Sequence, residues 1–115
     1  MPLIDNQARD RIRELNDTFR QGFDGKLGKV VMTAGVSEFG ADIKVRIMMA
    51  VREFSAFDDA DDPHGEHDFG SIELFAKTFF WKIDYYDNDL RNGSEDSSDP
   101  RKAKRVLTIM LAEEY

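Results

Sequence analysis

Residues 68–86 read DFGSIELFAKTFFWKIDYY, and this stretch decides the fold. Phe, Trp, Ile and Tyr occupy alternate positions from 79 to 85. Such alternation is typical of a β-strand with one face in the core. A second β-rich run, 68–75, precedes it, and only Ala76 and Lys77 separate the two. The sequence therefore predicts a hairpin over 68–86, although Ala-Lys lacks the Gly or Asn usual in a two-residue turn.

Helical patterns lie on the N-terminal side of this hairpin. Residues 4–23 carry an apolar stripe at steps of three and four: Ile4, Ala8, Ile12, Leu15, Phe19 and Phe23. This spacing predicts an amphipathic helix. Residues 29–36, KVVMTAGV, predict a short strand. Residues 41–57 fit both periods, but their length and their Met and Ala content favour a helix.

The C-terminal stretch also shows helical spacing. Asp99 is a suitable N-cap and Pro100 suits the first helical position. Ala103, Val106, Leu107, Met110 and Leu111 then form a stripe, which predicts a helix over 100–114. The expected order is α-β-α-β-β-α. We therefore expect one α+β domain, 1–115, with a small antiparallel sheet of about three strands, including the 68–86 hairpin, packed against helices.

Composition limits the class of protein. The chain has no Cys, which excludes disulfides, thiolate catalysis and Cys-based metal sites. The sequence shows neither a signal peptide nor a transmembrane run, so a cytoplasmic location is expected and a membrane partner is not. The net charge is −7, and the stretch 53–76 has eight acidic residues and no Lys or Arg. General nucleic-acid binding is disfavoured, because it usually requires a basic patch.

The densest acidic stretch is DDADDPHGEH, residues 58–67. Imidazole and carboxylate groups are ligands for divalent metals. The candidate metal ligands are His64, His67, Asp61, Asp62, Glu66 and Asp68. The stretch does not match the calcium helix–loop–helix pattern. A solvated acidic loop is the favoured interpretation, because Asp, Pro and Gly favour turns and charge runs are usually solvated.

The strand predicted over 79–87 has a second face, which carries Phe80, Lys82, Asp84 and Tyr86. Trp and Tyr are enriched at interfaces, because they bury a large area and still offer a polar tip. Trp81, Asp84 and Tyr86 are therefore candidates for a binding surface. The simplest interpretation of the alternating aromatic residues is a core strand.

Three motifs resemble one family: DDPHGEHDFG at 61–70, FWKIDYYD at 80–87 and VLTIMLAEEY at 106–115. The chain is similar to the bacterial domain of unknown function 3768. The resemblance covers nearly the whole chain. It implies a small single-domain protein, often encoded near plasmid or integrative-element genes, with no established activity and no assigned catalytic residues.

Two functions follow as expectations. No nucleophile elbow, Walker A loop, dinucleotide-binding glycine pattern or HExxH motif is present. The first expectation is a non-enzymatic accessory or regulatory protein that binds a protein partner through an acidic face, in one version by imitating nucleic acid. The alternative is a small metal-dependent enzyme, such as a hydrolase, with its site at 61–68. A structural cation that only fixes the loop is a third interpretation.

Overall fold

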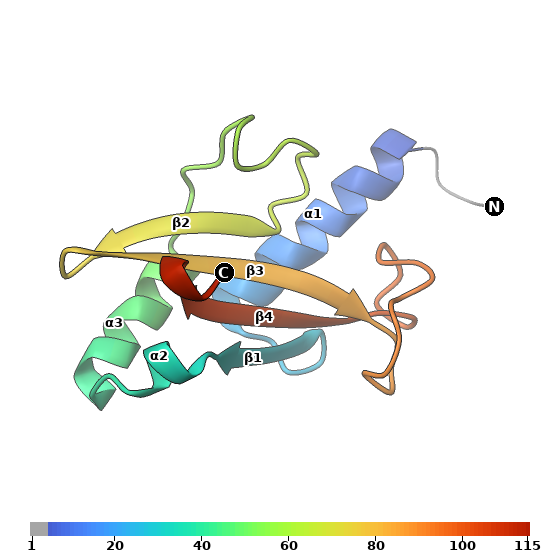
Figure 1. Cartoon of the computed structure of the whole chain (residues 1–115). Helices are drawn as coiled ribbons and strands as arrows, with labels where there is room; N and C mark the ends of the chain where they lie inside the picture. The colour runs from blue at the N-terminus through green and yellow to red at the C-terminus, as the bar shows by residue number, and fades with distance from the viewer. Residues whose placement is uncertain (1–4) are drawn as a thin grey trace.

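The structure is a computed structural model that describes residues 5–115. Its elements in chain order are α1 (Asp5–Gly22), β1 (Gly28–Met32), α2 (Ala34–Ser37), α3 (Ala41–Arg52), β2 (Phe69–Leu74), β3 (Lys77–Tyr86), β4 (Lys104–Leu111) and the 3-10 helix η1 (Ala112–Glu114). The α+β class is confirmed (Figure 1).

The sheet is larger and more mixed than predicted. Its four strands lie in the order β1-β4-β3-β2. β3 is antiparallel to both β2 and β4, whereas β1 is parallel to β4. The expectation of a three-stranded antiparallel sheet was therefore wrong in these details. The parallel pair arises because the last strand inserts between β1 and β3, a placement that the local pattern does not encode.

The predicted C-terminal helix over 100–114 was wrong, because most of this segment is β4. The alternate residues Arg105, Leu107 and Ile109 are fully buried. The same run also places apolar residues at helical spacing, because β4 is a central strand with little exposure on either face. The turn before it uses Asp99 as an acceptor for the backbone N–H of Arg101, at 2.9 Å. Asp99 thus forms a turn and not a helix cap.

The predicted hairpin is confirmed, with its turn one residue earlier than expected. Leu74 pairs with Lys77, so the two turn residues are Phe75 and Ala76. Both have positive φ angles, 55° and 59°. This geometry suits the twist of a hairpin, which explains why the turn forms without Gly or Asn.

The other predicted elements end earlier than expected. The helix predicted over 4–23 is α1; position 4 lies outside the described residues. The strand predicted over 29–36 stops at Met32, and α2 follows. The helix predicted over 41–57 is α3, which ends at Arg52, and the chain then turns into the loop 53–68.

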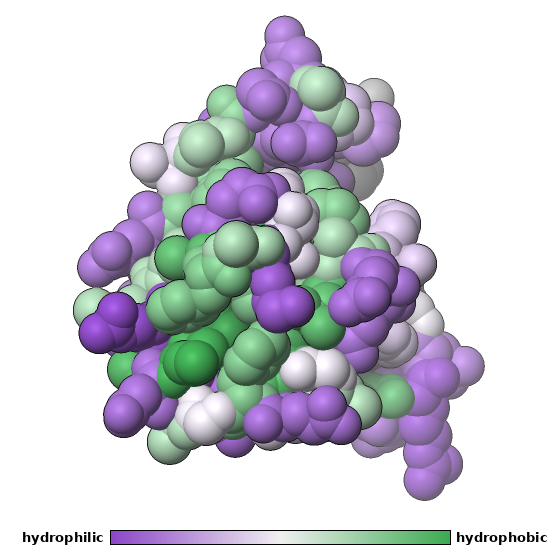
Figure 2. Space-filling view, turned by 60° about the vertical axis from the view of Figure 1, so that its left-hand side comes forward, coloured by the Kyte–Doolittle hydropathy of each residue, from purple (hydrophilic) through white to green (hydrophobic). Residues whose placement is uncertain are grey.

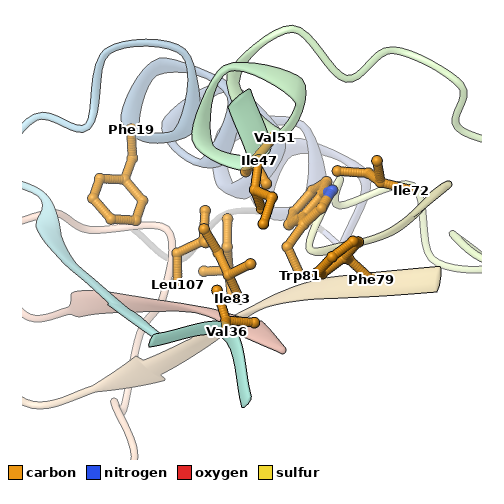
Figure 3. Close-up of a cluster of buried hydrophobic side chains, with 10 residues drawn as sticks. Phe19, Val36, Ile47, Val51, Ile72, Phe79, Trp81, Ile83 and Leu107 are labelled. Carbon is orange, nitrogen blue, oxygen red and sulfur yellow. The ribbon is translucent and has the colours of Figure 1, made fainter. Parts of the chain in front are cut away.

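The helices cover one face of the sheet, and the core lies between them and that face (Figure 1). Phe79, Trp81 and Ile83 project from β3 into this core, as their alternation predicted. Figure 3 shows them facing side chains from α1, α2 and α3. The buried cluster comprises Phe19, Val36, Ile47, Val51, Ile72, Phe79, Trp81, Ile83, Leu107 and Ile109. At about 25 cal/mol per Å² of apolar surface, this burial is the main stabilising term.

Among residues 5–115, no long helix lies on the opposite face of the sheet (Figure 1). The C-terminal Tyr115 lies against Phe69 and Phe80, with ring centroids 6.2 and 5.6 Å away. Glu114 holds η1 in place, because its carboxylate accepts hydrogen bonds from the Thr33 hydroxyl and from the N–H of Gly35.

Figure 2 shows the molecule from the end that carries the hairpin turn and α3. Apolar surface gathers near the centre of this view and polar side chains surround it. Val45 and Met49 of α3 and Phe75 of the turn are among the large apolar residues left exposed. Within residues 5–115, none of the helices has the length and apolar character needed to cross a bilayer.

Candidate functional site

The acidic loop 53–68 is packed against the core and is not freely solvated along its whole length. Phe54 and Phe57 lie edge-on to Trp81, with ring centroids 5.5 and 6.2 Å away. Phe57 also stacks on the imidazole of His67, with centroids 3.7 Å apart and planes 2° from parallel. These aromatic contacts fix both ends of the loop on the core.

His67 connects the end of the loop to α1. Its Nδ1 lies 2.9 Å from Oδ1 of Asp17, and its Nε2 lies 3.6 Å from Oδ2 of Asp62. Asp62 also accepts a hydrogen bond from the backbone N–H of His67, at 3.1 Å. Both ring nitrogens thus face carboxylates of the protein. The arrangement fastens the loop to α1, because Nδ1 is within hydrogen-bonding distance of Asp17.

A second connection centres on two fully buried side chains, Asn16 and Arg105. The side-chain amide of Asn16 in α1 donates to the carbonyl of Glu66, at 3.0 Å, and to the hydroxyl of Tyr85, at 2.8 Å. Its oxygen accepts a hydrogen bond from Nε of Arg105, at 2.6 Å. Arg105 in turn donates from Nη2 to the carbonyl of Ser97, at 2.7 Å. One buried network therefore joins α1 to the loop 53–68 and to the loop 87–99.

The charge states within this network follow from burial. Desolvation lowers the pKa of Arg105 and raises the pKa of Tyr85, whereas the hydrogen bond from Asn16 partly offsets the shift at Tyr85. The guanidinium of Arg105 also lies over the ring of Tyr85, 5.2 Å from its centroid. Arg105 remains a cation, because an arginine side chain is effectively always protonated in proteins.

Arg20 fills a similar role at the other end of the loop. Its guanidinium is 1% exposed and donates to the carbonyls of Val51 and Arg52, at 2.8 and 3.1 Å. Asp17 lies 3.3 Å from its Nη2, so the same carboxylate contacts both Arg20 and His67. Arg20 thus holds the end of α3, where the loop begins, against α1.

A shallow groove of about 440 Å³ lies between α1 and residues 63–66. The positively charged Arg9 lines the groove on the α1 side. The exposed His64 and the half-buried Glu66 line it on the loop side. Burial and the nearby Asp68 raise the pKa of Glu66 above its ordinary value. Burial also raises the pKa of Asp68, with further repulsion from Asp62. Both shifts favour the protonated carboxyl, and of these two residues Glu66 lines the groove.

The six predicted metal ligands lie in one loop but do not form a coordination sphere. His64 faces the groove, whereas His67 and Asp62 face each other. Asp61 is exposed and its backbone N–H bonds to Asp58 within the loop. Throughout residues 5–115, no three His, Asp or Glu side chains are arranged to hold a metal ion.

The predicted binding surface is divided between two faces. Trp81 is 0% exposed in the core, so it is not available to a partner. Asp84 lies on the opposite face and pairs with Lys82 at 3.0 Å, a contact that raises the pKa of Lys82. Tyr86 shares that face, since it stands two residues further along β3.

Comparison with known proteins gives a family. Residues 32–114 match the model of a family described as a protein of unknown function, DUF3768. The chain belongs to the DUF3768 family. No curated protein and no solved structure matches. The DUF3768 match includes both acidic loops but begins after α1, so Asn16, Asp17 and Arg20 lie outside it.

Sequence reasoning missed the residues that position the loops in this DUF3768 protein: Asn16, Asp17, Arg20 and Arg105. A signal was present for three of them. Asn16 and Arg20 stand directly beside Leu15 and Phe19 of the apolar stripe, and Arg105 alternates with Leu107 and Ile109. A polar residue at a core-facing position needs a buried partner, which predicts a network.

Proposed function

We propose that this DUF3768 protein is an accessory or regulatory protein that binds a basic protein partner through the loops 53–68 and 87–99. One observation carries the proposal: the two loops contain the negative charge of the chain and are joined by one buried network. Together they carry a formal charge of −11, against −7 for the whole chain, so the remainder is positive by four.

Charge placed in this way favours association with a basic surface. The exposed acids Asp58, Asp59 and Asp61 project from the first loop, and Glu95 and Asp96 from the second. The first loop runs alongside β2 and ends where that strand begins, and the second loop follows the end of β3 (Figure 1). A field of one sign steers a partner of opposite charge and speeds its association.

The anchoring of the loops supports binding more than catalysis. The Asn16 and Arg105 hydrogen bonds hold the backbone at Glu66 and Ser97. A preordered surface loses less entropy on binding than a flexible loop does. His67 is held between the carboxylates of Asp17 and Asp62, so these groups serve internal contacts, and this too favours a binding surface.

The test compares two variants that carry the same net charge. Asp58→Asn/Asp59→Asn/Asp61→Asn neutralises three exposed acids of the first loop. The control, Glu38→Gln/Asp42→Asn/Glu113→Gln, neutralises three exposed acids outside both loops. The probe is an oligolysine peptide, with binding followed by fluorescence anisotropy at low and at high salt. Proteins captured from a bacterial lysate are then measured in the same way.

We expect the loop variant to bind about tenfold more weakly at low salt, and the control to bind as the wild type does. High salt reduces the difference, because exposed charges are screened beyond about 10 Å at 0.1 M. Equal loss in both variants indicates attraction by net charge alone and contradicts the proposal. Equal binding by all three proteins contradicts it too.

A further inference from the structure

The outer edge of β1 has no partner strand among the described residues. β1 is the first strand in the order β1-β4-β3-β2 and is parallel to β4. The carbonyl of Leu27 accepts from the N–H of Arg105, at 2.9 Å, and the N–H of Thr33 donates to Ile109, at 3.0 Å. In a parallel ladder, alternate residues direct both backbone groups to the same neighbour. The backbone groups of residues 29 and 31 therefore bond to β4, and the N–H and C=O groups of residues 28, 30 and 32 point outward.

Nothing in the described chain occupies those outward groups. No hydrogen bond recorded for residues 5–115 outside the strand ladders reaches the backbone of Gly28, Val30 or Met32. Charged side chains and Pro commonly protect edge strands, and GKVVM has one charged residue, Lys29, and no Pro. The outward backbone groups of β1 are therefore open to pairing.

We propose that β1 pairs antiparallel with β1 of a second copy of this chain, about a two-fold axis at Val30. The register follows from which groups point outward. A register centred on Val30 sets Gly28 opposite Met32 of the other copy and Val30 opposite Val30, so all three outward residues are paired. A register centred on Lys29 or Val31 pairs only two of them. Each such pair exchanges two hydrogen bonds, or about six in total. The two sheets become one sheet of eight strands.

Charge favours β1 over the other edge of the sheet, β2. The loop 53–68, with seven acids and no Lys or Arg, leads directly into β2 and lies beyond it in Figure 1. A two-fold pair at β2 brings two of these loops together, whereas a pair at β1 leaves them at opposite outer ends. At β1, Lys29 faces Val31 of the other copy, so no like charges are directly opposed.

Cysteine cross-linking tests the register, and the natural chain has no cysteine to interfere. In Lys29→Cys/Val31→Cys, position 29 faces position 31 of the other copy in a non-hydrogen-bonded pair. Its Cα separation of about 4.5 Å is within disulfide range. Ser71→Cys/Glu73→Cys is the matched control on β2, with the same spacing on one face of an edge strand.

Mild oxidation is expected to link the β1 variant into covalent dimers and to leave the β2 control monomeric. Dimers formed by the control but not by the β1 variant place the contact at β2 and overturn the proposal. Failure of the β1 variant to cross-link, when its circular dichroism is native, overturns it too.

Charge substitution at Val31 gives an independent readout in solution. Val31→Glu sets a carboxylate against Lys29 of the other copy, and Val31→Lys sets a like charge there. Both variants change the same partly exposed side chain, so any loss of folding stability in the monomer is expected to be similar in the two.

In sedimentation velocity, we expect Val31→Glu to dimerise about tenfold more tightly than Val31→Lys, with the wild type between them. Equal dissociation constants, or a wild type that remains monomeric to about 1 mM, overturn the proposal. The second result leaves the edge to an extended segment of a different protein.

Discussion

Replacing Asn16 by alanine removes the centre of the buried network. The side chain is 0% exposed and makes three hydrogen bonds, to the Glu66 carbonyl, the Tyr85 hydroxyl and Nε of Arg105. The hydrogen bond to the charged Arg105 contributes about 1.5–3 kcal/mol and each neutral one about 1 kcal/mol. We therefore expect Asn16→Ala to lower the free energy of unfolding by roughly 3–5 kcal/mol, a large part of the stability of a small domain.

Urea unfolding measures this change, followed by far-UV circular dichroism and by the fluorescence of the single Trp. Asn16→Asp is expected to lose less than Asn16→Ala, because a carboxylate still accepts from Arg105. Thr18→Ala is the control: Thr18 is exposed on the same helix, so its loss is expected within about 0.5 kcal/mol. If Asn16→Ala unfolds at the same urea concentration as Thr18→Ala, the network does not stabilise the fold and our reasoning is wrong.

Two further changes have opposite pH dependence. Burial raises the pKa of Asp68 on folding, so the Asp68 anion destabilises the folded protein above the ordinary pKa of 3.8. We expect Asp68→Asn to melt at a higher temperature than the wild type at pH 7. This difference in melting temperature should disappear near pH 3. Hydrogen bonds lower the pKa of Glu114, that from the Thr33 hydroxyl most, so the Glu114 anion stabilises the protein above pH 4.5 and this stabilisation is lost as the pH falls. We expect Glu114→Gln to melt at a lower temperature than the wild type at pH 7 only. A change of melting temperature with the same sign in both variants at pH 7 contradicts these pKa shifts. Gly70→Ala should cost about 1–3 kcal/mol in urea unfolding, because its new Cβ would meet the indole of Trp81; an unchanged midpoint would show that the strand can shift.

The sequence predicted the elements whose local pattern and tertiary environment agree. α1 has one apolar stripe and one partner layer, and its period of 3.6 identified it. β3 alternates because one face is buried and the other is not. The hairpin was predicted from two adjacent β-rich runs even though its turn, Phe75-Ala76, has unusual residues for its positive φ angles.

β4 could not be identified, because its environment is set by distant strands. It lies between β1 and β3, which are about 75 and 20 residues away in sequence. A central strand carries apolar residues on both faces, and its alternation is then hidden. Arg105 made the strand harder to identify, because an Arg in the sequence indicates an exposed position. Only the structure shows that Asn16 is its buried partner.

The candidate site was predicted only in part. The loop 58–67 was identified as unusual, but its two histidines were treated as equivalent. The structure separates them, because Asp17 and Asp62 hold His67 while His64 faces the groove. Contacts made across some 50 positions decide this difference, and no local pattern reports them.

The place of β4 also bears on how the protein is made. This strand joins β1 to β3, yet it is made after β1, β2 and β3. Until then β1 has no neighbour and one edge of β3 is unpaired. The nascent chain therefore cannot fold in stages from its N-terminus, and it relies on late, long-range closure, which is slow and exposes strands to aggregation. Chains that terminate before Lys104 should be recovered as unfolded, protease-sensitive material and not as a smaller stable domain.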